Sequence, residues 1–171
     1  MRVLIAGVGN ILRVDDAFGV EVARRLEHEP FPPGVRVVET GIAGIALVQE
    51  LQEGWDALVV VDAVDHQRAP GTVLLIEPEV VDVQDLTWGE RSDLLADMHL
   101  ATPERVLMLA KAMGILPPTL LMVGCQIADP DAVGQGMTAP VAAAVDIAVQ
   151  EIRRYVARLV APADGVEAQS A

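Results

Sequence analysis

A short apolar run, a glycine turn and a pair of acids open this chain of 171 residues. Residues 2–6 contain valine, leucine and isoleucine and stop at Gly7, a pattern that favours a buried parallel strand over a helix. Gly7 and Gly9 permit a sharp turn of the backbone, and Asp15 and Asp16 follow where the next helix should begin. This order is typical of the first unit of an open α/β sheet, in which the strand ends carry the chemistry.

The glycine turn differs from the fingerprint of dinucleotide-binding proteins. A GxGxxG motif requires a third glycine where Leu12 stands. Asp15 and Asp16 also follow where a pyrophosphate needs positive partial charge, so nucleotide binding at this turn is disfavoured. Either acid can instead cap the helix expected at residues 17–29. Capping accounts for one acid of the pair and leaves the other unexplained.

The charge balance excludes several classes of partner. The chain carries 12 Lys and Arg against 25 Asp and Glu, a formal net charge of −13, which repels phosphate backbones and anionic lipids. We therefore expect no nucleic-acid partner and no membrane partner. The acidity fits either a basic protein partner or a surface that keeps the protein in solution. No apolar run reaches the ~18 residues of a membrane span, and the opening residues lack the cleavage pattern of a signal peptide, so we expect a cytoplasmic protein.

The single cysteine, Cys125, ends the apolar run at residues 120–125. One cysteine cannot form an intrachain disulfide, and a reducing compartment suits it best. No base is visible next to it in the sequence. A small hydrophobic residue in a buried strand is therefore a better interpretation of Cys125 than a nucleophile.

Apolar runs and helix-period stretches alternate along the chain, and 52% apolar residues are ample for one core. The order predicts an α/β fold: a single three-layer α/β/α domain with a mostly parallel five-stranded sheet. The strand at 72–76 can be antiparallel, because its connection is too short for a crossover helix. We place the domain at residues 1–160 and a flexible C-terminal tail at 161–171. The expected strands are 2–6, 35–39, 57–61, 72–76 and 120–125, and the expected helices are 17–29, 45–53, 102–114 and 138–160.

Residues 78–101 show no clear period. A stretch of about 20 residues without periodicity in a compact domain is a functional loop or an unrecognised helix. This segment contains His99, just before the expected helix that Thr102 would cap.

Two acids and this histidine can meet at one edge of the sheet. Parallel sheets bind ligands outside the carboxyl ends of their strands, which in the common strand order 2-1-3-4-5 means between strands 1 and 3. Asp16 follows the first strand and Asp62 ends the third. Taken singly, Asp62 can equally hold loop amides and His99 can be a surface residue. Together with Asp16 they form an O,O,N ligand set that suits nickel or zinc.

Several blocks of sequence together resemble a known family. The blocks are Gly7-Val8-Gly9-Asn10 with the acids at 15 and 16, Glu39-Thr40-Gly41-Ile42-Ala43-Gly44, Val61-Asp62-Ala63, His99, Val123-Gly124-Cys125-Gln126 and Gly136-Met137-Thr138-Ala139-Pro140-Val141. The similarity runs from Met1 to about Val160, and through these blocks the chain resembles the NiFe-hydrogenase maturation endopeptidases. The enzymes of that family remove a short C-terminal peptide from the precursor of a hydrogenase large subunit after nickel insertion.

The resemblance implies that Asp16, Asp62 and His99 are both the catalytic and the metal-contacting residues. It also implies that nickel is carried by the substrate, that no permanently bound cofactor is needed, and that the large-subunit precursor is a transient partner. The sequence departs from the family at two acids. Asp16 replaces a frequent glutamate and is one methylene shorter, and Glu39 stands where an aspartate often precedes the glycines.

On this interpretation the three side chains contact spare coordination positions of the substrate's nickel. Cleavage follows either from a scissile carbonyl polarised by nickel or from a water activated by a carboxylate. Activity should fall on acidification, because an imidazole ligand must be neutral and His99 would become protonated. Residues 40–44 either carry substrate backbone or simply connect a strand to a helix.

Two other functions remain open at this stage. A non-hydrolytic nickel-binding or metal-checking module would use the same three ligands. A small α/β enzyme acting on nucleosides or nucleotides would use the glycine turn, and its ligand binding would depend on Gly9 and not on His99.

Overall fold

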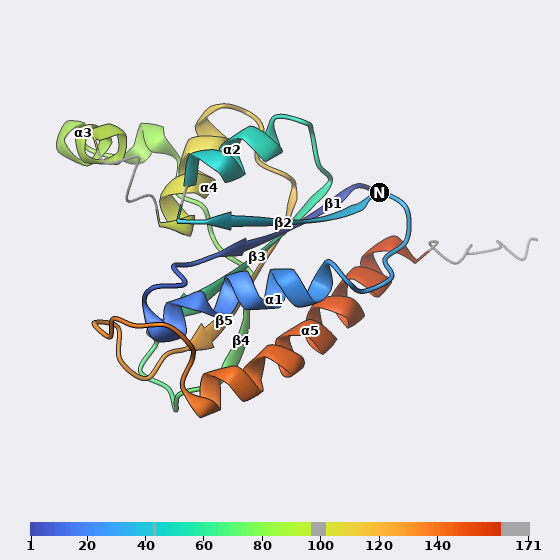
Figure 1. Cartoon of the computed structure of the whole chain (residues 1–171). Coiled ribbons are helices and arrows are strands. Elements are labelled where there is room, and N and C mark those ends of the chain that lie inside the picture. Colours follow the sequence, from blue (N-terminus) through green and yellow to red (C-terminus); the bar gives the residue numbers. More distant parts are fainter. Residues whose placement is uncertain (43, 97–101, 162–171) are drawn as a thin grey trace, which may run out of the picture.

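The computed structural model describes residues 1–42, 44–96 and 102–161, and it contains the expected mostly parallel five-stranded sheet (Figure 1). The strand order is β2-β1-β3-β5-β4. In this order β2, β1, β3 and β5 run parallel to one another. At the edge β4 pairs antiparallel with β5, as the short connection before β4 predicted. The strands are β1 Val3–Val8, β2 Val35–Gly41, β3 Ala57–Val64, β4 Val73–Ile76 and β5 Thr119–Gln126.

Helices cover both faces of the sheet and complete the three layers (Figure 1). Successive residues of β1 point to opposite faces, and each face has its own core. Val3 and Ile5 pack in a cluster with α1 and α5, whereas Leu4 and Ala6 pack with α2 and α4. Burial on both faces explains why the central strands are apolar throughout. The helices are α1 Phe18–Leu26, α2 Gly44–Leu51, α3 Trp88–Ala96, α4 Pro103–Ala112 and α5 Ala139–Val160, with 3-10 helices at Val14–Ala17 and Val83–Asp85.

The structure decides one alternative that the sequence left open and corrects one detail of the sheet. Residues 78–101 include the helix α3, which extends away from the sheet (Figure 1). Its first residue, Trp88, is 85% exposed. The last two strands are also exchanged relative to the common order, because β5 returns through α4 to lie between β3 and β4. The reversal of strand order between β1 and β3 is unaffected by that exchange.

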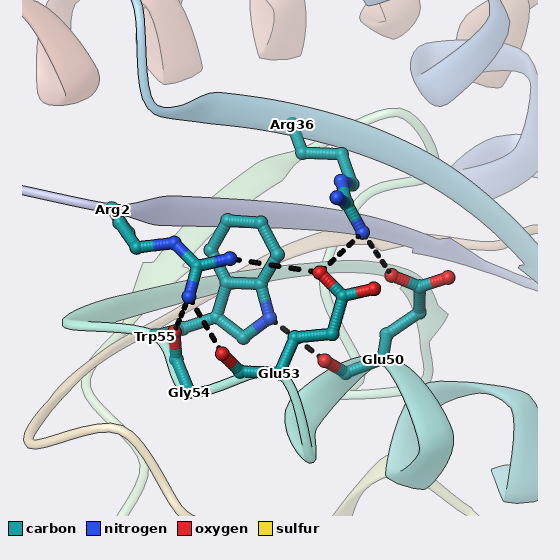
Figure 2. Close-up of polar contacts among 6 residues, drawn as sticks. All are labelled: Arg2, Arg36, Glu50, Glu53, Gly54 and Trp55. Atoms are coloured by element: carbon teal, nitrogen blue, oxygen red, sulfur yellow. Dashed lines mark hydrogen bonds and ion pairs between the residues drawn. The ribbon is translucent and has the colours of Figure 1, made fainter.

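A cationic and aromatic cluster ties the amino edge of the sheet together (Figure 2). The guanidinium of Arg2 stacks on the ring of Trp55 at 4.4 Å and donates to the carbonyls of Glu53 and Gly54, just beyond the end of α2. Trp55 Nε1 donates to the carbonyl of Glu50 at 2.8 Å. Arg36 pairs with the carboxylates of Glu50 and Glu53. These contacts link β1, β2 and α2 to the start of β3.

Among the helices that the structure describes, none combines the length and hydrophobicity that a bilayer crossing requires.

Candidate active site

The Asp16 carboxylate lies on a turn that folds back over the end of β1. The Asn10 amide donates to the Asp16 backbone oxygen at 3.1 Å and to Asp16 Oδ2 at 3.0 Å. Gly9 makes this turn possible, since its φ is +143° and a Cβ there would lie 1.9 Å from the Asp16 carbonyl. The segment Val14–Ala17, which carries Asp16, is a 3-10 helix. The sequence therefore fixes this acid at the carboxyl edge of the sheet.

Asp62 lies near the carboxyl end of β3, beside the end of β1. A close approach of α1 brings the two strand ends and the Asp16 turn together, because a Cβ on Gly19 would lie 2.2 Å from the carbonyls of both Val8 and Val61. The Asp62 side chain is partly buried, and its Oδ1 accepts from the Ala63 amide at 2.8 Å.

The electrostatics of Asp62 show which groups surround it. Burial raises the pKa of the Asp62 carboxyl well above its ordinary value, and the hydrogen bond from Ala63 offsets this in part. The charges of Asp16 and Glu104 raise the pKa of Asp62 further. The charge of Asp16 thus acts on Asp62. The structure adds the charge of Glu104, an acid in the first turn of α4, to the surroundings of Asp62.

His99, the third predicted site residue, lies outside the described residues. Within residues 1–42, 44–96 and 102–161, no three His, Cys, Asp or Glu side chains are grouped so as to hold a metal ion. The joint placement of Asp16, Asp62 and His99 therefore stays a prediction from sequence.

Asp15, the other acid of the pair, has a different environment. It is 1% exposed, and its carboxylate accepts hydrogen bonds from the amide and hydroxyl of Thr138 and from the amide of Ala128. Neither acid caps α1 through its side chain, since the N-cap position of that helix is Ala17. The interpretation of one acid as a helix cap is therefore wrong. Asp15 instead joins the first turn to the segment between β5 and α5.

Gln126 has a structural role that the sequence reasoning missed. This side chain, 3% exposed at the end of β5, accepts from the amides of His66 and Arg68 at 2.7 and 3.1 Å. Its amide nitrogen donates to Asp65 Oδ1 at 3.0 Å. Gln126 therefore holds the loop after β3 at the same edge as Asp62. The signal for this role was one amide side chain ending an otherwise apolar strand.

An apolar pocket of about 280 Å³ lies beside the Asp16 turn. Ile11, Leu12 and Ile42 are exposed around it at 44%, 54% and 62%. Glu39 also lines the pocket, and its carboxylate is paired with the Arg24 guanidinium at 3.0 Å. The remaining lining residues are Gly9, Asn10, Val20 and Gly41. The pocket therefore adjoins the candidate site, because Asn10 lines it and the backbone amide of Asn10 donates to Asp16.

Cys125 is completely buried in β5. Burial, assisted by the charge of Asp15, raises the pKa of its thiol to about 12. The thiol is protonated near neutral pH, which confirms the interpretation of Cys125 as a small buried residue rather than a nucleophile.

Comparisons with known proteins agree with the resemblance found in the sequence. The HycI family model, described as hydrogenase maturation protease, matches residues 20–155. The hydrogenase expression/formation protein HupM of Azotobacter chroococcum mcd 1 is 38% identical over 149 residues, which cover 86% of this chain and 68% of that protein. HoxM of Azotobacter vinelandii, with the same description, is 35% identical over 157 residues, which cover 91% of this chain and 72% of HoxM.

Solved structures lead to the same family. The hydrogenase maturating endopeptidase HybD from E. coli superposes with a TM-score of 0.71 at 25% identity, covering 94% of each chain. A hydrogenase 2 maturation peptidase from a Thaumarchaeota archaeon gives a TM-score of 0.66 at 28% identity, covering 91% of this chain and 98% of the other. The protein studied is a hydrolase and belongs to the hydrogenase maturation protease family.

Proposed function

We propose that this protein is the endopeptidase that removes the C-terminal extension of a NiFe-hydrogenase large-subunit precursor once nickel has been inserted. The observation that carries the proposal is the pair of carboxylates, Asp16 and Asp62, gathered at the carboxyl ends of β1 and β3. Ligand sites of open parallel sheets lie at this edge, where the strand order reverses. Membership of the hydrogenase maturation protease family supports the reaction class.

His99 is the third residue of the proposed site, and its distance along the chain supports this. Glu104, whose charge acts on Asp62, follows His99 by five residues. Five residues span at most about 18 Å, a length of chain that is compatible with the imidazole approaching the two acids. Asp16, Asp62 and His99 then offer two oxygens and one nitrogen, a donor set that nickel accepts.

Nickel in this proposal is part of the substrate. Thiolates of the precursor hold the ion, and Asp16, Asp62 and His99 bind its free coordination positions. The raised pKa of Asp62 supports this division of roles, because a divalent cation compensates the buried negative charge that the protein environment alone leaves costly. A precursor without nickel lacks the group that these side chains recognise. Hydrolysis follows from a carbonyl polarised by nickel or from a water activated by a carboxylate.

The apolar pocket supplies a contact for the polypeptide on one side of the scissile bond. Ile11, Leu12 and Ile42 expose enough apolar surface to receive an aliphatic side chain. The turn at Gly41 then lies where substrate backbone passes, one of the two interpretations that the sequence left open. Cleavage removes the extension and the enzyme releases the product, so the encounter in the cytoplasm is transient.

The proposal is tested with purified enzyme and two forms of one large-subunit precursor, nickel-loaded and metal-free. We expect a shortened product only from the nickel-loaded form, seen by mass spectrometry of the intact protein. His99→Ala should abolish that product and leave the thermal midpoint unchanged. Binding of the loaded precursor without cleavage would instead establish the non-hydrolytic metal-checking module. Efficient cleavage of the metal-free form would overturn recognition through nickel.

A further inference from the structure

Asp15 is a buried carboxylate next to a proposed metal-contacting acid, yet it does not share that acid's environment. It is 1% exposed, whereas Asp16 is partly exposed. The Asp15 oxygens accept the Thr138 amide at 2.7 Å, the Thr138 hydroxyl at 2.9 Å and the Ala128 amide at 3.0 Å. These three hydrogen-bond donors belong to two residues more than a hundred positions away along the chain, and they offset the cost of burying the Asp15 charge.

Further contacts join the same two segments. The Val14 amide donates to the Gly134 carbonyl at 3.1 Å, and the Gly134 amide donates to the Leu12 carbonyl at 2.9 Å. The Arg13 side chain donates to the Pro130 carbonyl at 2.7 Å. The turn at residues 10–16 is therefore attached to the segment at residues 128–138 through both backbone and side chains.

The backbone of the turn is held in an unfavourable conformation. Val14 has a φ of +45°, a left-handed value that is rare for a β-branched residue and costs of order 1–3 kcal/mol. Such a conformation persists only where the surroundings fix it. Two sets of contacts fix it here. Asp15, the next residue, is held by Thr138, and Val14 itself donates its amide to Gly134.

The fixed turn has a direct consequence for Asp16. Asp15 and Asp16 are consecutive in one 3-10 helix, so contacts that hold Asp15 also fix the backbone from which the Asp16 side chain projects. Asp16 Oδ2 accepts from the Asn10 amide, which is part of the same turn. Loosening Asp15 would therefore let Asp16 rotate away from Asp62.

We propose that Asp15 is a positioning residue, which through Thr138 and Ala128 fixes the Asp16 carboxylate beside Asp62. The inference rests on the proposed function, because Asp16 matters to processing only if it contacts the substrate's nickel. On this proposal, the segment between β5 and α5 affects catalysis by holding Asp15, and thereby Asp16, in position. A misplacement of about 1 Å at a reacting group costs about 100-fold in rate.

Three variants separate positioning from simple stabilisation. Asp15→Asn retains the shape of the side chain but replaces one accepting oxygen by an amide NH2 group, so that two hydrogen-bond donors face each other. Thr138→Val removes one hydroxyl donor, and Thr138→Ser restores it. The matched control is Val156→Ala, a cavity in the same helix α5 that destabilises the core. Val156 follows Thr138 by 18 residues, roughly 27 Å along the helix.

Two measurements are made on each variant. One is the rate of processing of nickel-loaded precursor per folded enzyme molecule. The other is hydrogen exchange of the Asn10 amide in the enzyme alone, which reports whether the Asp16 turn stays in place, because both the backbone carbonyl and the carboxylate of Asp16 accept from that amide. We expect Asp15→Asn to lower the rate about 100-fold and Thr138→Val about 10-fold. In both variants Asn10 should lose protection, whereas Thr138→Ser and Val156→Ala should keep both the rate and the protection of the original protein.

The two hypotheses fail in different ways. If the original enzyme does not cut nickel-loaded precursor, the proposed function is wrong, and Asn10 exchange still tests whether Asp15 positions Asp16. If Asp15→Asn and Thr138→Val lower the melting temperature but keep the rate, Asp15 is only structural and the inference is overturned. Unchanged Asn10 protection in both variants overturns it as well.

Discussion

At the scale of single residues, Asp62 places an ionisable group where the fold disfavours its charge. Burial and the charges of Asp16 and Glu104 raise its pKa, so its ionisation costs stability as the pH rises from the unfolded-state pKa through the raised folded-state value. We predict that Asp62→Asn keeps or raises the thermal midpoint at neutral pH and lowers processing at least about 100-fold. Calorimetry measures the thermal midpoint, and the precursor assay measures processing. Wild-type processing by this variant would remove Asp62 from the site.

Glu104 offers a way to change the pKa of Asp62 without altering a proposed ligand. Its negative charge raises that pKa, although less than burial does. We predict that Glu104→Gln lowers the pKa of Asp62, so that the carboxyl group stays ionised at lower pH. Carbon-13 NMR titration of the Asp62 carboxyl measures the shift directly. The control is Glu27→Gln, at an exposed acid just after α1, which should leave the titration of Asp62 unchanged. An equal shift in both variants would contradict a specific effect of the Glu104 charge on the pKa of Asp62.

Cys125, unlike Asp62, is a residue of a reactive type that we place outside the proposed site. Its thiol is fully buried, and its pKa of about 12 keeps it protonated near neutral pH. We predict that iodoacetamide does not modify the folded protein and that Cys125→Ala processes precursor at the original rate. Mass spectrometry after labelling and the precursor assay are the measurements. Rapid labelling in the folded state would show that β5 opens and that the thiol is available.

At the scale of structural elements, the two edges of the sheet have separate tasks. The amino edge holds the cluster of Arg2, Arg36 and Trp55, which joins three strands and α2 (Figure 2). The carboxyl edge holds Asp16 and Asp62. A change at the amino edge should therefore alter stability and leave the chemistry intact.

This separation gives a stability prediction. Trp55 is 8% exposed and stacks against two guanidinium groups. We predict that Trp55→Ala destabilises the fold by about 3 kcal/mol, which lowers the melting temperature by about 8 °C. Well below that temperature the variant should process precursor at the original rate. The pattern is the reverse of that expected for Asp62→Asn, and a Trp55 variant that melts normally but cuts slowly would contradict the separation.

The elements also show what the sequence could and could not predict. The apolar runs predicted all five strands. The apolar signature is clearest in the central strands β1, β3 and β5, which are buried on both faces. The helix α3 was only one of two interpretations of residues 78–101, because the segment shows no clear period. Its first residue, Trp88, faces solvent, and a helix that extends away from the sheet needs no apolar stripe.

The candidate site was predictable to the extent that topology determines it. Asp16 and Asp62 could be paired because the end of the first strand must lie beside the end of the third. Asp15 could not be assigned, since its partners Ala128 and Thr138 lie on a segment whose path no local pattern encodes. The same holds for Gln126, whose acceptors and donors belong to a loop that returns from β3.

At the scale of the whole molecule, the strand order reverses beside the acids of the proposed site. Connections from β1 lead outward to β2, and those from β3 lead to β5 and β4 on the other side. Open parallel sheets bind ligands at such a reversal of strand order. The charge of Asp16 acts on Asp62 across it, although the two acids are 46 positions apart in the chain.

This geometry leads to a prediction about where the metal must reside. The enzyme is proposed to supply two carboxylates and an imidazole, and the precursor to hold nickel through its own thiolates, which bind this ion more strongly than carboxylates do. Treating the enzyme with a chelator, and removing the chelator before the assay, should leave processing unchanged. The same treatment of the precursor should abolish processing, and reloading it with nickel should restore the shortened product. The comparison is made with one stock of each protein, so the only variable is which partner lost its metal. Loss of processing after treatment of the enzyme alone, reversed by nickel added to the enzyme, would mean that the ion belongs to the protease, and the proposed recognition of a metal-loaded substrate would then be wrong.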